Sequence, residues 1–210
     1  MGLKKGNFFL TLGLLFFLAA IFVAGFNLYI GIQAGEEARD IANAIKVVVK
    51  DKPIDTTGFG EEVTDSKDYT DREMPVIEVL GYNYIGTLEI PDLELVLPIM
   101  EDWDDERLRV SPCRYSGSFY EDNMVIAGHN YARHFSPIKT LPMGTEIIFV
   151  DAEGIAYNYE ISWSESLKGT QIEEMTSKSN EPGKDWDLTL FTCSFDGGKR
   201  VAIRCIRTDK

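Results

Sequence analysis

The first constraint on this chain is a long segment without charge. Residues 8–32 carry no charged side chain, and Phe, Leu, Ile, Ala and Val dominate the run. A bilayer core of about 30 Å is crossed by about 20 helical residues. A buried helix of a soluble protein rarely runs this far without a charge. We therefore predict one membrane-spanning helix, with the rest of the chain folded beside the membrane.

The flanks of this segment predict its orientation. A cleaved signal peptide has a shorter apolar core of about 7–15 residues, and residues 30–35 show no clear small-x-small cleavage site. Lys4 and Lys5 precede the span, whereas Glu36 and Glu37 follow it. The positive-inside tendency then predicts a single-pass cell-membrane protein with a cytoplasmic N-terminus and an extracellular catalytic domain.

The charge is distributed unevenly along the chain. With 21 Lys and Arg against 34 Asp and Glu, the net charge is −13, which argues against nucleic acid as a partner. Residues 1–35 carry +2, residues 36–75 carry −5 and residues 76–210 carry −10. We predict three parts with these boundaries: a cytoplasmic tip with the transmembrane anchor, an acidic and partly helical stalk, and a catalytic domain.

Within the predicted stalk, residues 36–50 have helical spacing, with Ile41, Ile45 and Val48 on one stripe. Pro53 is expected to end this helix. Residues 51–75 are acidic and rich in Gly, Thr, Ser and Asp, which is typical of a flexible linker.

The predicted domain consists of short apolar runs separated by turn residues. About eight short strands in some 135 residues predict an all-β domain with a few short helices, closed or nearly closed as a β-barrel. The clearest predicted strands are residues 84–90, 94–99, 124–127, 146–150, 156–161, 188–191 and 201–206. The predicted short helices are residues 104–109, 136–140 and 170–177.

The chain has two histidines, and both lie in one short segment. His129 follows a buried strand in the sequence Ile126-Ala127-Gly128-His129-Asn130, where the glycine lets a ligand or backbone approach closely. A histidine packed in a loop by chance is the alternative. His134 stands beside Arg133 and Phe135 and is expected to be a solvated loop residue.

Cys193 is the candidate nucleophile because it ends a strand before a loop. A thiol with a pKa of about 8.5 is only a few per cent thiolate at neutral pH, so catalysis needs a partner that takes the proton, and histidine suits this task. A buried structural thiol is the alternative. Cys113 and Cys205 form either a disulfide or two plain buried thiols.

Arg200 lies seven residues after Cys193, so the two residues can face each other across a hairpin. A fixed cation at that place can stabilise an oxyanion. Arg204 lies on the same face of the strand by the two-residue period, and spacing alone favours Arg200.

This combination resembles the sortases, the membrane-anchored cysteine transpeptidases of Gram-positive bacteria. The resemblance rests on Gly128-His129-Asn130, on Thr189-Leu190-Phe191-Thr192-Cys193, which matches the family's TLxTC motif, and on Arg200 at the start of a Val/Ile strand. It covers roughly residues 80–207. It implies the eight-stranded sortase β-barrel, with Cys193 as nucleophile, His129 as general acid/base and Arg200 as oxyanion or substrate-carbonyl donor. Thr192 and Asn130 are assigned to substrate binding.

The resemblance also implies the reaction. A sortase cleaves a C-terminal LPxTG-like sorting signal of a secreted protein and forms a thioacyl intermediate, which an amine of a cell-wall precursor resolves. A pilin-polymerising sortase, a plain cysteine hydrolase and a non-catalytic membrane-tethered binding module are the alternatives. A class D-like enzyme is favoured, because no Asp-Pro-aromatic lid motif precedes the barrel and Asp102-Trp103 lacks the proline.

No cofactor or metal is expected for this chemistry. The acidic residues Glu101, Asp102, Asp104, Asp105 and Glu106, together with Glu173 and Glu174, supply oxygen ligands of the kind that bind Ca²⁺. A solvated acidic surface is the favoured interpretation of this cluster.

Overall fold

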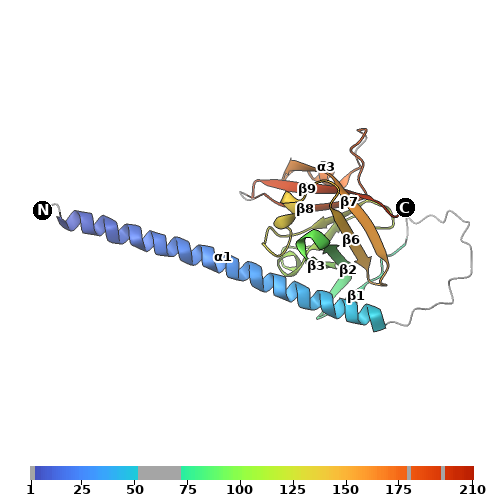
Figure 1. Ribbon diagram of the computed structural model, residues 1–210, viewed down its shortest axis with the longest axis horizontal. Coiled ribbons are helices and arrows are strands. Elements are labelled where there is room, and N and C mark those ends of the chain that lie inside the picture. Colours follow the sequence, from blue (N-terminus) through green and yellow to red (C-terminus); the bar gives the residue numbers. More distant parts are fainter. Residues whose placement is uncertain (1–2, 52–71, 179–180, 195–196) are drawn as a thin grey trace, which may run out of the picture.

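The computed structural model of the protein describes residues 3–51, 72–178, 181–194 and 197–210 (Figure 1). The strands are β1 (Ile77–Val79), β2 (Tyr82–Ile90), β3 (Leu95–Met100), β4 (Cys113–Ser116), β5 (Met124–Ala127), β6 (Glu146–Asp151), β7 (Ala156–Lys168), β8 (Leu188–Cys193) and β9 (Lys199–Arg207). The helices are α1 (Leu3–Asp51), α2 (Arg107–Val110) and α3 (Ile172–Thr176), with two 3₁₀ turns, η3 (Pro91–Leu93) and η4 (Pro137–Thr140).

The sheet closes on itself. Its strand order is β1-β2-β3-β4-β5-β8-β9-β7-β6, and β2 also pairs with β6. Within the described residues, β2 to β9 therefore form an eight-stranded closed barrel, and β1 extends the edge of β2. Closure removes the exposed edges of the other strands, and it confirms the predicted all-β barrel with few helices.

Two strands were not predicted, and β7 shows the largest difference in length. β1 and β4 were not expected, because β1 has three residues and the four residues of β4, Cys-Arg-Tyr-Ser, do not form an apolar run like that of β5. β7 continues to Lys168, well beyond residue 161, because a register shift between Ile161 and Trp163 lets it keep pairing with β9. The predicted hairpin at residues 151–154 is present, and Gly154 has the positive φ of +88° that its turn requires.

Helix α1 joins the apolar segment to the barrel without a break. Residues 8–49 form a helix that is long and apolar enough to cross a membrane. Its first half projects away from the barrel and its second half runs along the barrel wall (Figure 1). The buried residues of this second half are Gly31, Ala34, Gly35, Ala38, Ile41, Ala42 and Ile45.

These buried residues are spaced three and four apart and therefore share one helix face. Ala38 belongs to the main core of the barrel, so the described part of the predicted stalk packs against the domain. Val48, expected on the same stripe, is exposed. Pro53 and most of the predicted linker lie outside the described residues.

Candidate active site

The candidate site is a cleft of about 320 Å³ at one end of the barrel. β5 and β8 run parallel, with Ala127 opposite Phe191, so both strands end at the same edge. The hydrogen bonding between the two strands extends one residue beyond β5, because the Gly128 N–H donates to the carbonyl oxygen of Phe191 at 3.0 Å. His129 and Cys193 each follow the Ala127–Phe191 pair by two residues. Both line the cleft.

The β8–β9 hairpin adds the third polar side chain. Its register pairs Cys193 with Arg200, as the hairpin length predicts, and Arg200 also lines the cleft. The Ser194 N–H donates to the carbonyl oxygen of Lys199 at 2.9 Å and fixes the hairpin. The Arg200 guanidinium donates only to the carbonyl oxygens of Gly197 and Lys199, at 3.4 and 3.3 Å, and no carboxylate of the described residues pairs with it.

The walls of the cleft are apolar and aromatic. Trp103, Tyr115 and Phe191 form a continuous row, with ring centroids 4.9 Å apart for the first pair and 5.3 Å for the second. Ile172 and Met175 of α3 contribute further apolar lining. Sequence reasoning missed these wall residues, because no local pattern marks them. They come from segments that only the closed barrel brings together.

The environment of His129 sets its proton state. Burial lowers the pKa of His129 below its usual 6.5, and the nearby Arg109 acts in the same direction, whereas Asp105 acts against them. The imidazole is therefore neutral at neutral pH. A neutral imidazole beside a thiol can accept its proton.

The three cysteines are all free, so the predicted alternative of a disulfide between Cys113 and Cys205 is not present. Burial raises the pKa of Cys113 to about 12, and burial raises the pKa of Cys205 as well. Both are core thiols that remain protonated. Cys193 is partly exposed in the cleft and is the one cysteine placed to meet a substrate.

The two residues assigned to substrate binding lie in different places. Thr192 lines the cleft, and its buried hydroxyl has no hydrogen-bond partner among the described residues. The side-chain oxygen of Asn130 accepts a hydrogen bond from Lys139 Nζ at 2.5 Å, and Asn130 is not part of the cleft lining. The structure thus brings together four of the five predicted site residues.

His134 is buried rather than solvated as the sequence predicted. Its Nε2 atom lies 3.4 Å from the carbonyl oxygen of Ala34 in α1. Burial lowers the pKa of His134 to about 4, so this side chain is also neutral at neutral pH.

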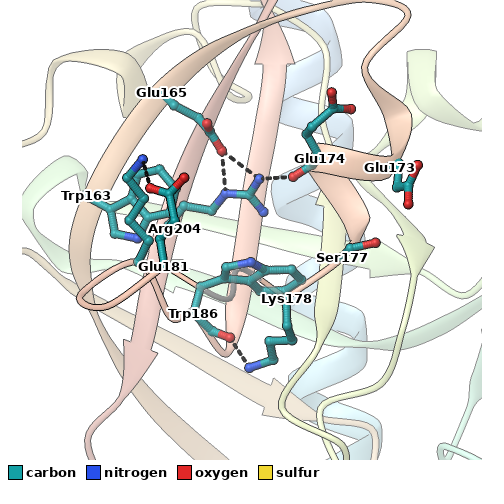
Figure 2. A pocket seen from close by; sticks show the side chains of 10 residues that line it. Trp163, Glu165, Glu173, Glu174, Ser177, Lys178, Glu181, Trp186 and Arg204 are labelled. Atoms are coloured by element: carbon teal, nitrogen blue, oxygen red, sulfur yellow. Dashed lines mark hydrogen bonds and ion pairs between the residues drawn. The ribbon is translucent and has the colours of Figure 1, made fainter.

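Arg204 occupies a separate pocket, shown in Figure 2. Its Nε and Nη2 atoms donate to Glu165 Oε1 at 3.1 and 2.7 Å. Its Nη1 atom donates to the hydroxyl of Thr189 at 2.7 Å. The indole rings of Trp163 and Trp186 lie 5.6 and 4.9 Å from the guanidinium carbon.

The same guanidinium also holds α3 against the barrel. Nη1 donates to the carbonyl oxygen of Met175 at 2.8 Å, and Nη2 donates to that of Glu174 at 2.7 Å. Arg204 is 1% exposed and its donors are occupied within the protein. This arginine has a structural role, which leaves Arg200 as the cation of the cleft.

Two of the acidic residues considered for calcium lie against arginine side chains. Asp104 pairs with Arg107, and Asp102 lies 3.6 Å from Arg114. In the ranges that the structure describes, no group of three or more His, Cys, Asp or Glu side chains is arranged to hold a metal ion. Calcium binding at these residues, the alternative to a solvated acidic surface, stays untested.

The fold and the cleft together define a closed β-barrel with a cysteine, a histidine and an arginine at one end. Comparison with protein families identifies a sortase domain over residues 88–208, more than half of the chain. The chain therefore belongs to the sortase family. A search of curated proteins found no match.

Solved structures of sortases have the same fold. Sortase C from Streptococcus pneumoniae has a TM-score of 0.60 at 15% identity, covering 81% of this chain and 97% of that chain. A sortase D5 transpeptidase from Clostridium perfringens has a TM-score of 0.57 at 18% identity, covering 82% and 99%. Sortase A from Corynebacterium diphtheriae has a TM-score of 0.52 at 20% identity, covering 86% and 85%. Since sortases are transpeptidases of the cell surface that act on proteins with sorting signals, the family supports the predicted transpeptidase function.

Proposed function

We propose that Cys193, His129 and Arg200 are the catalytic residues of this sortase and that it cleaves an LPxTG-like sorting signal. The observation that carries the proposal is the register at the barrel end. It places Cys193 opposite Arg200, and both share one cleft with His129. The other two cysteines are buried in the core.

In the proposed first half-reaction, neutral His129 takes the proton of the Cys193 thiol. The sulfur attacks the carbonyl carbon of the Thr–Gly bond, and the electron pair of that carbonyl moves to its oxygen. The Arg200 guanidinium, free of any carboxylate of the described residues, donates to this oxyanion. Collapse of the intermediate breaks the C–N bond, and His129 returns its proton to the departing amine.

The second half-reaction resolves the thioacyl enzyme. An acceptor amine attacks the thioester carbonyl, His129 takes a proton from the amine, and the Cys193 sulfur leaves and regains a proton. The product is a new amide bond. For the acceptor we propose an amine of a cell-wall precursor.

The cleft walls suit the apolar start of such a signal. Trp103, Tyr115 and Phe191 offer aromatic surface for the Leu-Pro part of an extended peptide. Thr192 borders the cleft, but its unpartnered hydroxyl is buried, so a hydrogen bond from it to the peptide requires the side chain to turn toward the cleft. Asn130, which the sequence assigned to substrate binding, contributes here only if the Lys139 contact opens.

For the cellular setting we propose that α1 anchors the protein in the cell membrane, with the N-terminus in the cytoplasm and the barrel outside. The segment 8–32 and its flanking charges support this orientation. The partners would be secreted proteins that carry the sorting signal.

We further propose wall anchoring by a class D-like enzyme rather than pilin polymerisation. The sequence has no Asp-Pro-aromatic motif ahead of the barrel. The compared structures include sortases C, D and A at similar scores, so this assignment rests on the sequence.

The test uses the full chain in detergent or nanodiscs, incubated with an LPxTG-type peptide with and without an added amine. The proposal predicts an amine-dependent transpeptidation product and no turnover by the Cys193→Ala variant. Product with water alone would indicate a hydrolase. Absence of any cleavage would favour a non-catalytic binding module.

A further inference from the structure

The segment 131–136, here named the His129 loop, folds back onto the residue it follows. The Phe135 N–H donates to the carbonyl oxygen of His129 at 3.1 Å, and the His134 N–H donates to that of Tyr131 at 3.1 Å. The imidazole of His129 stacks on the ring of Tyr131, with centroids 4.7 Å apart and planes 27° apart. The orientation of His129 is therefore determined by the position of this loop.

The loop is also packed tightly against the backbone next to His129. A Cβ atom added at Gly128 would lie 2.5 Å from the ring of Phe135. Phe135 is fully buried and belongs to the same core cluster as Ala38 of α1. A shift of the loop relative to α1 would thus move the main chain on either side of His129.

The outer side of the His129 loop lies directly on α1. A Cβ atom added at Gly35 would overlap the Cβ and Cδ atoms of Arg133. A Cβ atom added at Gly31 would lie 3.8 Å from the backbone nitrogen of Ala132. A contact of 3.8 Å is an ordinary one, so position 31 would accept a Cβ, whereas the absence of a side chain at Gly35 lets helix and loop approach each other closely.

His134 adds a directional contact to this packing. It is fully buried, and its Nε2 lies 3.4 Å from the carbonyl oxygen of Ala34. Because a carbonyl oxygen only accepts, the ring nitrogen that faces it carries the hydrogen. The contact is a long hydrogen bond from the loop to the main chain of α1, at the same helical turn as Gly35.

We propose that α1 is a positioning element of the active site: its contacts at Ala34 and Gly35 hold the His129 loop and thereby orient the imidazole of His129. The path runs from α1 through Arg133 and His134 to Tyr131, and from there to His129. This inference rests on the proposed function, because it assigns a support to the proposed general acid/base. Removing or distorting the helix would then impair the chemical step, in addition to any effect on membrane attachment.

The direct test compares two glycine substitutions in one helix. Gly35→Ala adds a Cβ atom against Arg133, whereas Gly25→Ala adds one where no atom lies within 4 Å. Both substitutions exchange glycine for alanine inside the same helix, and of the two positions only 35 lies against Arg133. Displacing a catalytic group by about 1 Å can cost on the order of 100-fold in rate. We expect Gly35→Ala to lower kcat by roughly 10- to 100-fold with less than about a twofold change in KM, and Gly25→Ala to match the unmodified chain.

A second substitution tests the same contact by rescue. Arg133→Gly removes the three atoms that lie nearest to the new Cβ at position 35. The double variant is expected to recover kcat relative to Gly35→Ala. A general loss of stability at Gly35 would not be rescued in this way, so failure of the rescue contradicts the positioning role.

His134 provides the variants to use if Gly35→Ala does not fold. His134→Gln keeps a donor for the Ala34 carbonyl, and His134→Phe keeps a ring without one. We expect a lower kcat for the Phe variant than for the Gln variant, and equal values would overturn the inference. Full activity of Gly35→Ala would also overturn the inference. If Cys193→Ala is inactive in the same assay, the proposed function is still supported. An unmodified chain that does not turn over the peptide would overturn both.

Discussion

Arg200 and Arg204 lie four residues apart on the same face of β9, yet their surroundings are opposite. Arg200 borders an open cleft, and among the described residues it donates to two carbonyl oxygens of its own hairpin and to no carboxylate. Arg204 packs against two indole rings and donates to the carboxylate of Glu165 and the carbonyl oxygen of Glu174 (Figure 2). It also donates to a hydroxyl and to a second carbonyl oxygen. A guanidinium whose donors are met inside the protein supports the fold, whereas one that faces a cleft is available to a substrate.

The same contrast separates the two histidines. His129 is partly buried at the cleft, whereas His134 is enclosed between the His129 loop and α1. It also separates Cys193 from the two core thiols. Of the two arginines, the two histidines and the three cysteines compared, the accessible one in each case lines the cleft.

The largest effect on stability is expected at Arg204. Arg204→Ala leaves the buried Thr189 hydroxyl and the Met175 carbonyl oxygen without their donor, and it removes the partner of Glu165, which is itself 27% exposed. Leaving a buried polar group without a partner costs about 1–3 kcal/mol, so we expect a total loss of roughly 2–5 kcal/mol. Urea unfolding measures this loss in the free energy of unfolding. Arg207→Ala is the matched control on the same strand, because its ion pairs are more exposed and are worth about 0–1 kcal/mol. Equal losses in the two variants would contradict the structural role of Arg204.

The corresponding effect on catalysis is expected at Arg200. Losing one oxyanion donor typically lowers kcat by about 100- to 1,000-fold, so Arg200→Ala should lose activity on this scale while its unfolding midpoint stays near that of the unmodified chain. Steady-state kinetics with a sorting peptide measures the change. Near-full activity in Arg200→Ala would reverse the contrast between the two arginines.

The sequence predicted the features of the site that neighbouring residues encode, but not the contacts between segments far apart in the chain. The strand before His129, the motif that ends at Cys193 and the hairpin that brings Arg200 back are all encoded by neighbouring residues. The two arginines could not be separated, because a two-residue period places both on one face. Only the packing of α3 shows that Arg204 is enclosed.

His134 was misjudged for the same reason. Its sequence neighbours are those of a surface loop, and its burial depends on Ala34, one hundred residues away. The aromatic wall formed by Trp103 and Tyr115 was missed as well, because these rings come from separate segments.

The buried histidine predicts a pH dependence of stability. The pKa of His134 is about 4 in the folded chain and near 6.5 when exposed. The unfolded chain therefore binds a proton between these values, and the free energy of unfolding falls as the pH drops from about 6.5 to 4, by on the order of 3 kcal/mol. Denaturant unfolding at several pH values measures this slope.

His134→Gln is the control for this slope. The variant should show a shallower fall, with a remaining part from His129, whose pKa is also lowered. An unchanged slope in the variant would show that His134 is accessible to protons in the folded state.

The last comparison needs no substitution: it measures how fast a thiol reagent labels each cysteine. In the native chain, iodoacetamide should modify Cys193 at least about 100-fold faster than Cys113, because the latter is buried and its pKa is raised to about 12. Peptide mass mapping gives the rate for each cysteine, and labelling in denaturant should equalise them. Comparable native rates would contradict the division between cleft and core thiols.

The most direct test of the central claim is to trap the acyl group. The full chain is incubated with an LPxTG-type peptide without an acceptor amine, quenched in acid and digested for mass spectrometry. The account predicts an adduct of the peptide's N-terminal part through Thr, bound as a thioester to Cys193 and absent from Cys193→Ala. An adduct on another residue, or cleavage that persists in Cys193→Ala, would contradict it.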